Sequence, residues 1–389
     1  MAGLTRRQVV ATAGLALGAA ASPGGTLAAT DGSEPVLGED VKLYGDGLSL
    51  SPAELGRLLG GLTSSGEVEP DYYSTGGAVA AMEERFAAAL GKDRAVFFPS
   101  GTLANHVAIR SLAGAGTRVL VQEQSHVYND SGDCVQVLSH LDLVPLGEGR
   151  ASFTADEVRR ELRRAKAGRV RTGVGVISVE CPVRRKLGAL FDFEEMQRVA
   201  AVARDSGVRL HLDGARIYMA SATTGIPVAK YAELFDTVYV SLWKYFNAPF
   251  GAVLAGPAEL LDDVHHLRRM FGGGLPFAWP AAVVASHYLD GFLERFQEGM
   301  RRFDVLLRAL ENDGRCRVER VADGTNVAML KWEGEPSPET VRQRLALQGV
   351  HLWKPSTSFC GFYLVANETL ARMDPGHLAQ LITVALHQS

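Results

Sequence analysis

Cysteine is scarce in this chain, with four residues in 389, and no two of them form a Cys-x-x-Cys pair. That spacing is the usual signature of a structural zinc site, so we expect no bound metal. An excess of charge of one sign is missing as well, because 44 acidic residues balance 40 basic ones and the formal net charge is −4. Composition therefore gives no support to a protein that binds nucleic acid or an anionic membrane surface.

Long apolar runs are also missing, and the stretch nearest to one lies at the N-terminus. Residues 9–21 are apolar and rich in alanine and glycine, but they are too few to span a membrane. They follow the pair Arg6-Arg7 and precede small residues at 26–29. These features are typical of a twin-arginine export signal, with a flexible tail as the alternative. If the signal is used, the mature protein begins near Ala29 or Thr30 and is periplasmic or extracellular.

The middle of the chain alternates short apolar runs with helical patterns, which indicates an α/β fold with a mostly parallel sheet covered on both faces. Helices are predicted to start at Ser51-Pro52, to span 76–91 and to continue from about 280 to 310. Strands of the main sheet are predicted at 95–98, 118–121, 175–179, 208–212, 237–242 and 252–255. Two further runs, 326–330 and 361–365, predict a smaller C-terminal α+β domain.

An acid and a lysine each follow one of these predicted strands. Asp213 opens an Asp-Gly-Ala-Arg turn, and Lys244 follows it by 31 residues at the end of the next apolar run. Alone, an Asp-Gly pair is usually a turn and such a lysine is usually a solvated strand end. Together and in this order they suit pyridoxal phosphate (PLP). The lysine amine forms a Schiff base with the cofactor aldehyde, and the carboxylate pairs with the pyridinium nitrogen.

Four motifs stand in order along the chain: Pro-Ser-Gly-Thr-Leu-Ala-Asn at 99–105, the Asp213 turn, Asn-Ala-Pro-Phe-Gly at 247–251 and Arg-Arg-Met-Phe-Gly-Gly-Gly at 268–274. With these motifs the chain, from about Val41 onward, resembles the threonine aldolase and β-eliminating lyase family of fold-type I PLP enzymes. The resemblance implies a mostly parallel sheet of the seven-stranded type, sandwiched by helices. It also implies a homodimer or a homotetramer.

These observations predict four parts. They are a signal at 1–29, an N-terminal arm at 30–75, a PLP-binding large domain at 76–285, and a connecting helix with a small domain at 286–389.

Ser100, Gly101 and Thr102 follow a predicted strand and open a helix. Backbone N–H groups at a helix start, together with the Thr102 hydroxyl, can hold a phosphate. The alternative is a plain strand-to-helix turn with a Ser or Thr cap. The resemblance implies that this loop binds the PLP phosphate.

The remaining predicted site residues are His126, Arg216, Ser241 and Glu180. The resemblance implies that His126 stacks on the pyridine ring, where an imidazole can also act as an acid or base. Arg216 is predicted to approach the cofactor phenolic oxygen or the substrate carboxylate, with a surface salt bridge as the alternative. Ser241 is a predicted phosphate ligand. Glu180 either shapes the pocket or is a solvated strand end.

The chain also departs from the family pattern. Cys181-Pro182-Val183 stands where an Asn-Thr-His run is common, so a histidine proposed as the general base is missing. A Met-Arg-Gln run is missing after the triple glycine, and with it an arginine that contacts the phosphate. Phe362-Tyr363 stands where an arginine often holds the substrate carboxylate, with Lys354 or Asn367 as substitutes. Trp243, Tyr245 and Phe246 replace smaller residues and suggest a drier pocket.

The sequence therefore predicts a PLP-dependent lyase that cleaves the Cα–Cβ bond of a β-hydroxy-α-amino acid to glycine and an aldehyde. The catalytic residues are Lys244, Asp213 and His126, with His126 or a water that it positions as the base. The departures keep open another PLP reaction on amino acids: β-elimination, aminotransfer or racemisation. An exported binding protein without catalytic activity is the alternative from another class.

Overall fold

The computed structural model describes residues 38–170 and 172–387. The predicted export signal at 1–29 therefore lies outside the described residues. No helix in the described part of the chain is long and apolar enough to cross a membrane.

The main sheet has seven strands in the order β2-β8-β7-β6-β5-β3-β4. Strand β8 pairs antiparallel with both of its neighbours, and the other neighbouring pairs are parallel. Every strand except β8 therefore ends at the same edge of the sheet, which confirms the predicted fold class. The strands are β2 (Arg94–Phe98), β3 (Arg118–Gln122), β4 (Asp142–Leu146), β5 (Val174–Glu180), β6 (Arg209–Asp213), β7 (Thr237–Ser241) and β8 (Ala252–Gly256).

Both faces of this sheet are buried, because alternate residues of each strand point to opposite faces. In β2, Ala95 and Phe97 pack in one cluster with helix α2, while Val96 and Phe98 pack in another with helix α3. The helices of this part are α1 (Pro52–Leu62), α2 (Gly77–Leu90), α3 (Gly101–Ala113), α4 (His126–Asn129), α5 (Cys134–Ser139), α6 (Ala155–Ala167), α7 (Phe193–Ser206), α8 (Ile217–Thr224), α9 (Val228–Ala232), α10 (Ala258–Leu261), α11 (Val264–Met270) and α12 (Trp279–Leu289), with the 3-10 turn η1 (Arg184–Lys186).

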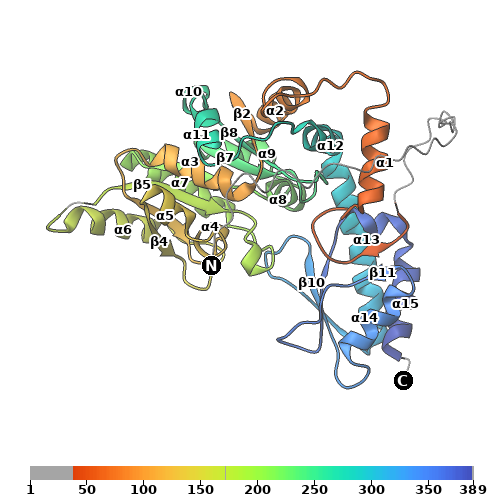
Figure 1. Ribbon diagram of the computed structural model, residues 1–389. Helices are drawn as coiled ribbons and strands as arrows, with labels where there is room; N and C mark the ends of the chain where they lie inside the picture. The colour runs from red at the N-terminus through yellow and green to blue at the C-terminus, as the bar shows by residue number, and fades with distance from the viewer. Residues whose placement is uncertain (1–37, 171, 388–389) are drawn as a thin grey trace, which may run out of the picture. The chain divides into compact units, whose positions relative to one another are not determined.

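A second, smaller core lies in the C-terminal part, where the antiparallel sheet β12-β10-β9 packs with three helices. Figure 1 shows α13, α14 and α15 gathered near the C-terminus, beside β10. Strand β1 of the N-terminal arm pairs in parallel with β11 and so belongs to this core. The elements are β1 (Val41–Lys42), α13 (Phe292–Asp313), β9 (Arg317–Arg320), β10 (Val327–Lys331), α14 (Pro338–Ala346), β11 (Val350–His351), β12 (Gly361–Val365), η2 (Glu368–Arg372) and α15 (Pro375–His387).

The helix predicted from about 280 to 310 is two helices in the structure. Helix α12 ends at Leu289 and α13 begins at Phe292. Gly291, the residue before α13, has φ +63°, a left-handed conformation that interrupts an α-helix and that glycine adopts at little cost. The apolar periodicity continues across this break, so the pattern predicted a single helix.

The helix predicted over 76–91 is present as α2, and its apolar face is buried. Phe86 on that face is fully buried against Phe246, with the two rings edge-to-face at 5.3 Å. We expect Phe86→Ala to lower the free energy of unfolding by about 3–5 kcal/mol, because it removes apolar contacts and leaves a cavity. Denaturant unfolding measures this. Leu347→Ala, at a side chain that is 85% exposed, is the control and should change stability by no more than about 0.5 kcal/mol.

Candidate active site

The predicted site residues lie at one edge of the main sheet, where the strands end. Asp213 is the last residue of β6, and Glu180, the last residue of β5, lies directly beside it in the register. Ser241 ends β7, and Lys244 follows three residues later. In the same way, Gly101 and His126 open the helices that follow β2 and β3. In parallel sheets this edge is where ligands bind.

Asp213 is a buried carboxylate with two hydrogen bonds. Its Oδ2 accepts from Asn105 Nδ2 at 2.7 Å, and its Oδ1 accepts from the Ala215 N–H at 3.2 Å. The residue is only 2% exposed, and no cation forms an ion pair with it within residues 38–170 and 172–387. A buried carboxylate without a cation is costly. The protonated ring nitrogen of PLP would supply the missing charge, so Asp213 fits the predicted cofactor.

Lys244 is half-buried, and its amine lies over aromatic rings. Its Nζ is 5.1 Å from the centre of the Trp243 ring and 6.0 Å from that of Tyr239. Burial lowers the pKa of Lys244 to about 8, and the nearby Arg216 charge acts in the same direction. Asp213 opposes this shift, which places the acid and the amine within electrostatic reach of each other. A neutral amine is the form that attacks an aldehyde, so this environment suits the predicted bond.

This pKa predicts how apoprotein takes up PLP. The reactive neutral amine is a minor form at pH 7 and the main form at pH 9. We therefore expect the rate of covalent attachment to rise about tenfold between these values, with a midpoint near the pKa of about 8. Stopped-flow absorbance of apoprotein mixed with PLP measures it. A midpoint near 10.5, the value of an ordinary lysine, would contradict the burial argument.

The start of α3 offers free backbone donors. The Ser100 hydroxyl caps the helix by accepting from Leu103 N at 3.3 Å, so the cap predicted as an alternative is present. The N–H groups of Gly101 and Thr102 precede the first intrahelical bond and can bind an anion. A Cβ at position 101 would collide with the Tyr239 hydroxyl, so the close packing at this turn requires glycine. Cofactor binding by all three residues stays a prediction.

Ser241 supplies a further buried polar group. The residue is fully buried, and among the described residues the Tyr239 hydroxyl is the neighbour that interacts with its hydroxyl oxygen. Buried hydroxyls are nearly always hydrogen-bonded in native proteins. A hydroxyl can take part in more than one hydrogen bond, so this group next to the Lys244 turn is a suitable ligand for a phosphate oxygen.

His126 and Glu180 are joined at the site. The His126 N–H donates to Glu180 Oε2 at 2.6 Å, and the Arg184 N–H donates to Oε1 at 2.9 Å. Glu180 is 4% exposed, so the alternative of a solvated strand end is wrong. Burial, followed by the nearby Asp213 charge, raises the pKa of Glu180 to about 7. Burial also lowers the pKa of His126, whose imidazole is therefore neutral at pH 7 and able to accept a proton.

Arg216 is held by a residue that the sequence did not reveal. Its Nε donates to Asp46 Oδ1 at 3.1 Å and its second guanidinium nitrogen lies 2.8 Å from Oδ2. Both side chains are 15% exposed, so this pair is not the surface salt bridge given as the alternative. The next residues of the arm bind the lysine turn, because the Leu48 N–H donates to Asn247 Oδ1 at 2.7 Å. The arm thus forms part of the site.

Of the two substitutes suggested for a carboxylate-binding arginine, Asn367 is already engaged within the protein and Lys354 stays a prediction. The Asn367 amide donates to three carbonyl oxygens of the arm, and its Oδ1 accepts from Thr369, so the prediction for Asn367 is wrong. Lys354 is exposed. Phe362 is buried in the small core, while the half-buried Tyr363 lies 5.1 Å from the Phe359 ring.

The aromatic residues around Lys244 divide into two kinds. Tyr245 and Phe246, which follow Lys244 directly, are buried in a cluster with Tyr218 and Phe292. Trp243 is 54% exposed. The prediction of a drier pocket thus fails for Trp243, whose side chain the sequence pattern could not orient.

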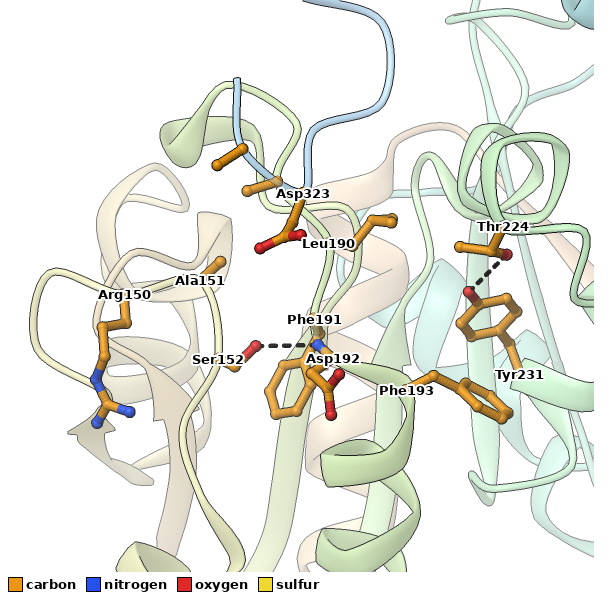
Figure 2. Close-up of a pocket in the computed structure, with 12 residues that line it drawn as sticks. Arg150, Ala151, Ser152, Leu190, Phe191, Asp192, Phe193, Thr224, Tyr231 and Asp323 are labelled. Atoms are coloured by element: carbon orange, nitrogen blue, oxygen red, sulfur yellow. Dashed lines mark hydrogen bonds between the residues drawn. The ribbon is translucent and has the colours of Figure 1, made fainter. Parts of the chain in front are cut away.

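A separate hollow of about 560 Å³ lies elsewhere on the fold and contains none of the predicted site residues. Figure 2 shows Ser152 bonded to the Asp192 N–H and Thr224 bonded to Tyr231 within it. Its lining mixes acidic, hydroxyl and aromatic side chains. Its lining contains no lysine, so it does not fit the predicted PLP chemistry.

Known proteins resemble this chain over most of its length. A low-specificity L-threonine aldolase of Eremothecium gossypii is 26% identical over 295 residues, which are 75% of this chain and 76% of the relative. Alanine racemase TOXG of Cochliobolus carbonum is 27% identical over 221 residues, 56% of this chain and 55% of the relative. The crystal structure of a putative L-allo-threonine aldolase from Listeria monocytogenes aligns with a TM-score of 0.73 at 26% identity, covering 89% of this chain and 95% of that one.

The family model for Beta-eliminating lyase matches residues 64–333. That match covers more than half of the chain and includes the predicted site residues between Ser100 and Lys244. The chain therefore belongs to the β-eliminating lyase family.

Proposed function

We propose that this protein is a PLP-dependent lyase that cleaves the Cα–Cβ bond of a β-hydroxy-α-amino acid to glycine and an aldehyde. The observation that carries the proposal is the pairing of Asp213, a buried carboxylate without a cation, with Lys244, an amine whose pKa is lowered to about 8. They lie at the ends of neighbouring parallel strands. Similarity to L-threonine aldolases supports the substrate class.

Bound PLP would supply an aldehyde for the lysine and a ring that accepts electrons from the substrate Cα. The protein supplies the rest. Lys244 would hold the cofactor through its amine, and Asp213 would keep the ring nitrogen protonated. Gly101, Thr102 and Ser241 would bind the phosphate through N–H and hydroxyl groups. Because Asp213 is buried, its interaction with the ring nitrogen would be stronger than in water.

The proton of the substrate β-hydroxyl goes to His126 or to a water that His126 positions. Burial keeps this imidazole neutral at pH 7, as a base must be. The His126 backbone N–H donates to Glu180, and this hydrogen bond fixes the position of the first residue of α4. Arg216 has charge of the right sign for the substrate carboxylate, although Asp46 already holds it from one side.

Product analysis tests the reaction. Protein loaded with PLP is incubated with L-threonine, L-allo-threonine, L-serine and the corresponding D-amino acids. We expect glycine and an aldehyde in equal amounts from at least one β-hydroxy amino acid. Pyruvate or 2-oxobutanoate without glycine would show β-elimination instead and would contradict the proposal. A colourless protein that binds no PLP would favour a binding protein without catalytic activity.

Racemisation is a second candidate, supported by the similarity to a protein named alanine racemase. It requires proton transfer at Cα but no bond cleavage to Cβ. The site holds Lys244 and His126 near Asp213, so two groups that can exchange protons are present. Incubation of L-alanine in heavy water distinguishes the reactions. Formation of D-alanine with deuterium at Cα, and no glycine from β-hydroxy amino acids, would favour the racemase.

We also propose that the protein is a homodimer or homotetramer. Three large apolar side chains, Tyr72, Met270 and Phe277, are each more than half exposed on joined segments. The Tyr73 N–H donates to Pro276 O at 2.9 Å, and Arg269 stacks on the Tyr73 ring. Exposed apolar side chains on segments that are bonded to each other in this way are typical of a protein–protein interface. Light scattering after gel filtration measures the molecular mass.

Export remains a proposal from the sequence. We propose that residues 1–29 direct the folded, PLP-loaded protein through the twin-arginine pathway. Replacing both Arg6 and Arg7 by Lys should retain the protein in the cytoplasm, because the pathway reads the arginine pair. Cell fractionation measures this. Equal amounts outside the cytoplasm for the variant and the unchanged protein would contradict the proposal.

A further inference from the structure

A line of buried polar side chains leads away from Asp213 into the protein. Asn105 Nδ2 lies 2.7 Å from Asp213 Oδ2, and Asn105 Oδ1 lies 2.8 Å from His211 Nε2. On the far side of the ring, His211 Nδ1 lies 2.9 Å from Thr237 Oγ1. The four residues come from α3, β6 and β7, and none is more than 2% exposed.

The carboxylate fixes the direction of every bond in this line. An ionised Asp213 can only accept, so the NH₂ group of Asn105 must face it. The amide oxygen then faces His211, whose Nε2 must carry the hydrogen. That leaves a lone pair on Nδ1, which accepts from the Thr237 hydroxyl. Each group therefore donates towards Asp213.

The ring of His211 stays neutral in this arrangement. Burial lowers the pKa of His211 to about 4, against the opposing effect of the Asp213 charge. A neutral ring adds no counter-charge near Asp213. The carboxylate is thus stabilised by polarised hydrogen bonds and remains available to pair with a cation from outside the protein. Hydrogen bonds aligned head to tail strengthen one another in a buried site.

We propose that Asn105 and His211 are positioning residues, which hold the Asp213 carboxylate ionised and aimed at the ring nitrogen of bound PLP, with Thr237 closing the line. The inference rests on the proposed function, since it requires PLP at Asp213. Neither residue touches the reacting atoms. Both act through the carboxylate, and this predicts that their effects depend on its presence.

A double-mutant cycle on PLP affinity tests that dependence. The variants are Asn105→Ala, Asp213→Ala and the double variant, and PLP is titrated into apoprotein while absorbance is followed. A hydrogen bond to a charged group is worth enough that Asn105→Ala should raise the Kd for PLP by about tenfold or more. In the Asp213→Ala background the same change should alter Kd by less than about twofold, because no carboxylate remains to be held.

Substitution of Thr237 gives a second test, with a smaller expected effect, because Thr237 contacts His211 and not Asp213. Thr237→Val removes the hydroxyl at nearly constant shape and should raise Kd by about threefold. Thr237→Ser keeps the hydroxyl and should restore the affinity. The matched control is Ser139→Ala, which removes a hydroxyl 2.7 Å from the ring of a different buried histidine, His106. This control should leave Kd unchanged.

Equal effects of Asn105→Ala with and without Asp213 would overturn the inference, as would a Thr237→Val variant with unchanged Kd. If Asn105→Ala fails to fold, the comparison of Thr237→Val with Thr237→Ser decides. Two different results separate a failure of the proposed function from a failure of this inference. Unaltered protein that binds no PLP would remove the proposed function and this inference with it, whereas PLP binding with additive effects would remove only the inference.

Discussion

Lys244→Ala is expected to abolish the covalent attachment of PLP and, with it, the activity. The variant should lose the long-wavelength absorbance that PLP gains when it is bound to a lysine. Activity should fall at least about a hundredfold, or roughly 2.7 kcal/mol of transition-state stabilisation. The reason is that, within residues 38–170 and 172–387, Lys244 is the amine that lies within electrostatic reach of Asp213. It follows β7 at the edge where Asp213 ends β6.

Absorbance spectra and reduction with borohydride followed by peptide mapping measure this result. Borohydride fixes the lysine bond, so the labelled peptide of the unaltered protein should contain Lys244. Lys230→Ala is the matched control, because Lys230 lies on α9, is exposed and forms an ion pair with Glu233. That variant should keep both colour and activity. Retention of covalent PLP by Lys244→Ala would reject the assignment.

Asp213→Ala is expected to have the second largest effect. Without the carboxylate the ring nitrogen loses its partner, so bound PLP withdraws electrons from the substrate less strongly. Removal of one preorganised electrostatic contact typically costs about 10²–10³-fold in kcat. Affinity for PLP should fall as well, because an ion pair that is buried with the cofactor is lost. Steady-state kinetics at saturating PLP separate the two effects.

Asp236→Ala is the control for this prediction. Asp236 lies at the opposite end of β6, where its carboxylate binds Arg209 and the Leu210 N–H, each at 2.7 Å. Its removal should lower stability without altering the spectrum of bound PLP. If Asp213→Ala kept the kcat of the unaltered protein at saturating PLP, Asp213 would have only a structural role.

The strands of the main sheet were predictable where their runs are apolar. Six were predicted, and all six are present. The seventh, β4, was not predicted, because its sequence Asp-Leu-Val-Pro-Leu includes a charge and a proline. Strand β4 lies at the edge of the sheet and pairs only with β3, so Pro145 breaks no ladder in the interior. Edge position is a property of the assembled sheet, and proline is tolerated there.

The site residues also differ in whether the sequence could predict them. Asp213 and Lys244 could be predicted because each follows an apolar strand, and parallel strands bring such ends to one edge. Asp46 could not, since it lies 170 residues from Arg216 in a segment without periodicity. His211 shares a strand face with Asp213, two residues away, and this spacing was the available signal. Asn105 meets both only when α3 packs on the sheet.

The order of apolar runs and the residues at their ends determined the α/β architecture and the edge where the chemistry lies, because strand direction and side-chain alternation are local properties. Which polar groups surround Asp213, that Asp46 holds Arg216, and how far burial lowers the pKa of Lys244 were decided by the tertiary structure alone. Hydrogen bonding and desolvation depend on groups far apart in the sequence, and only packing brings those groups together.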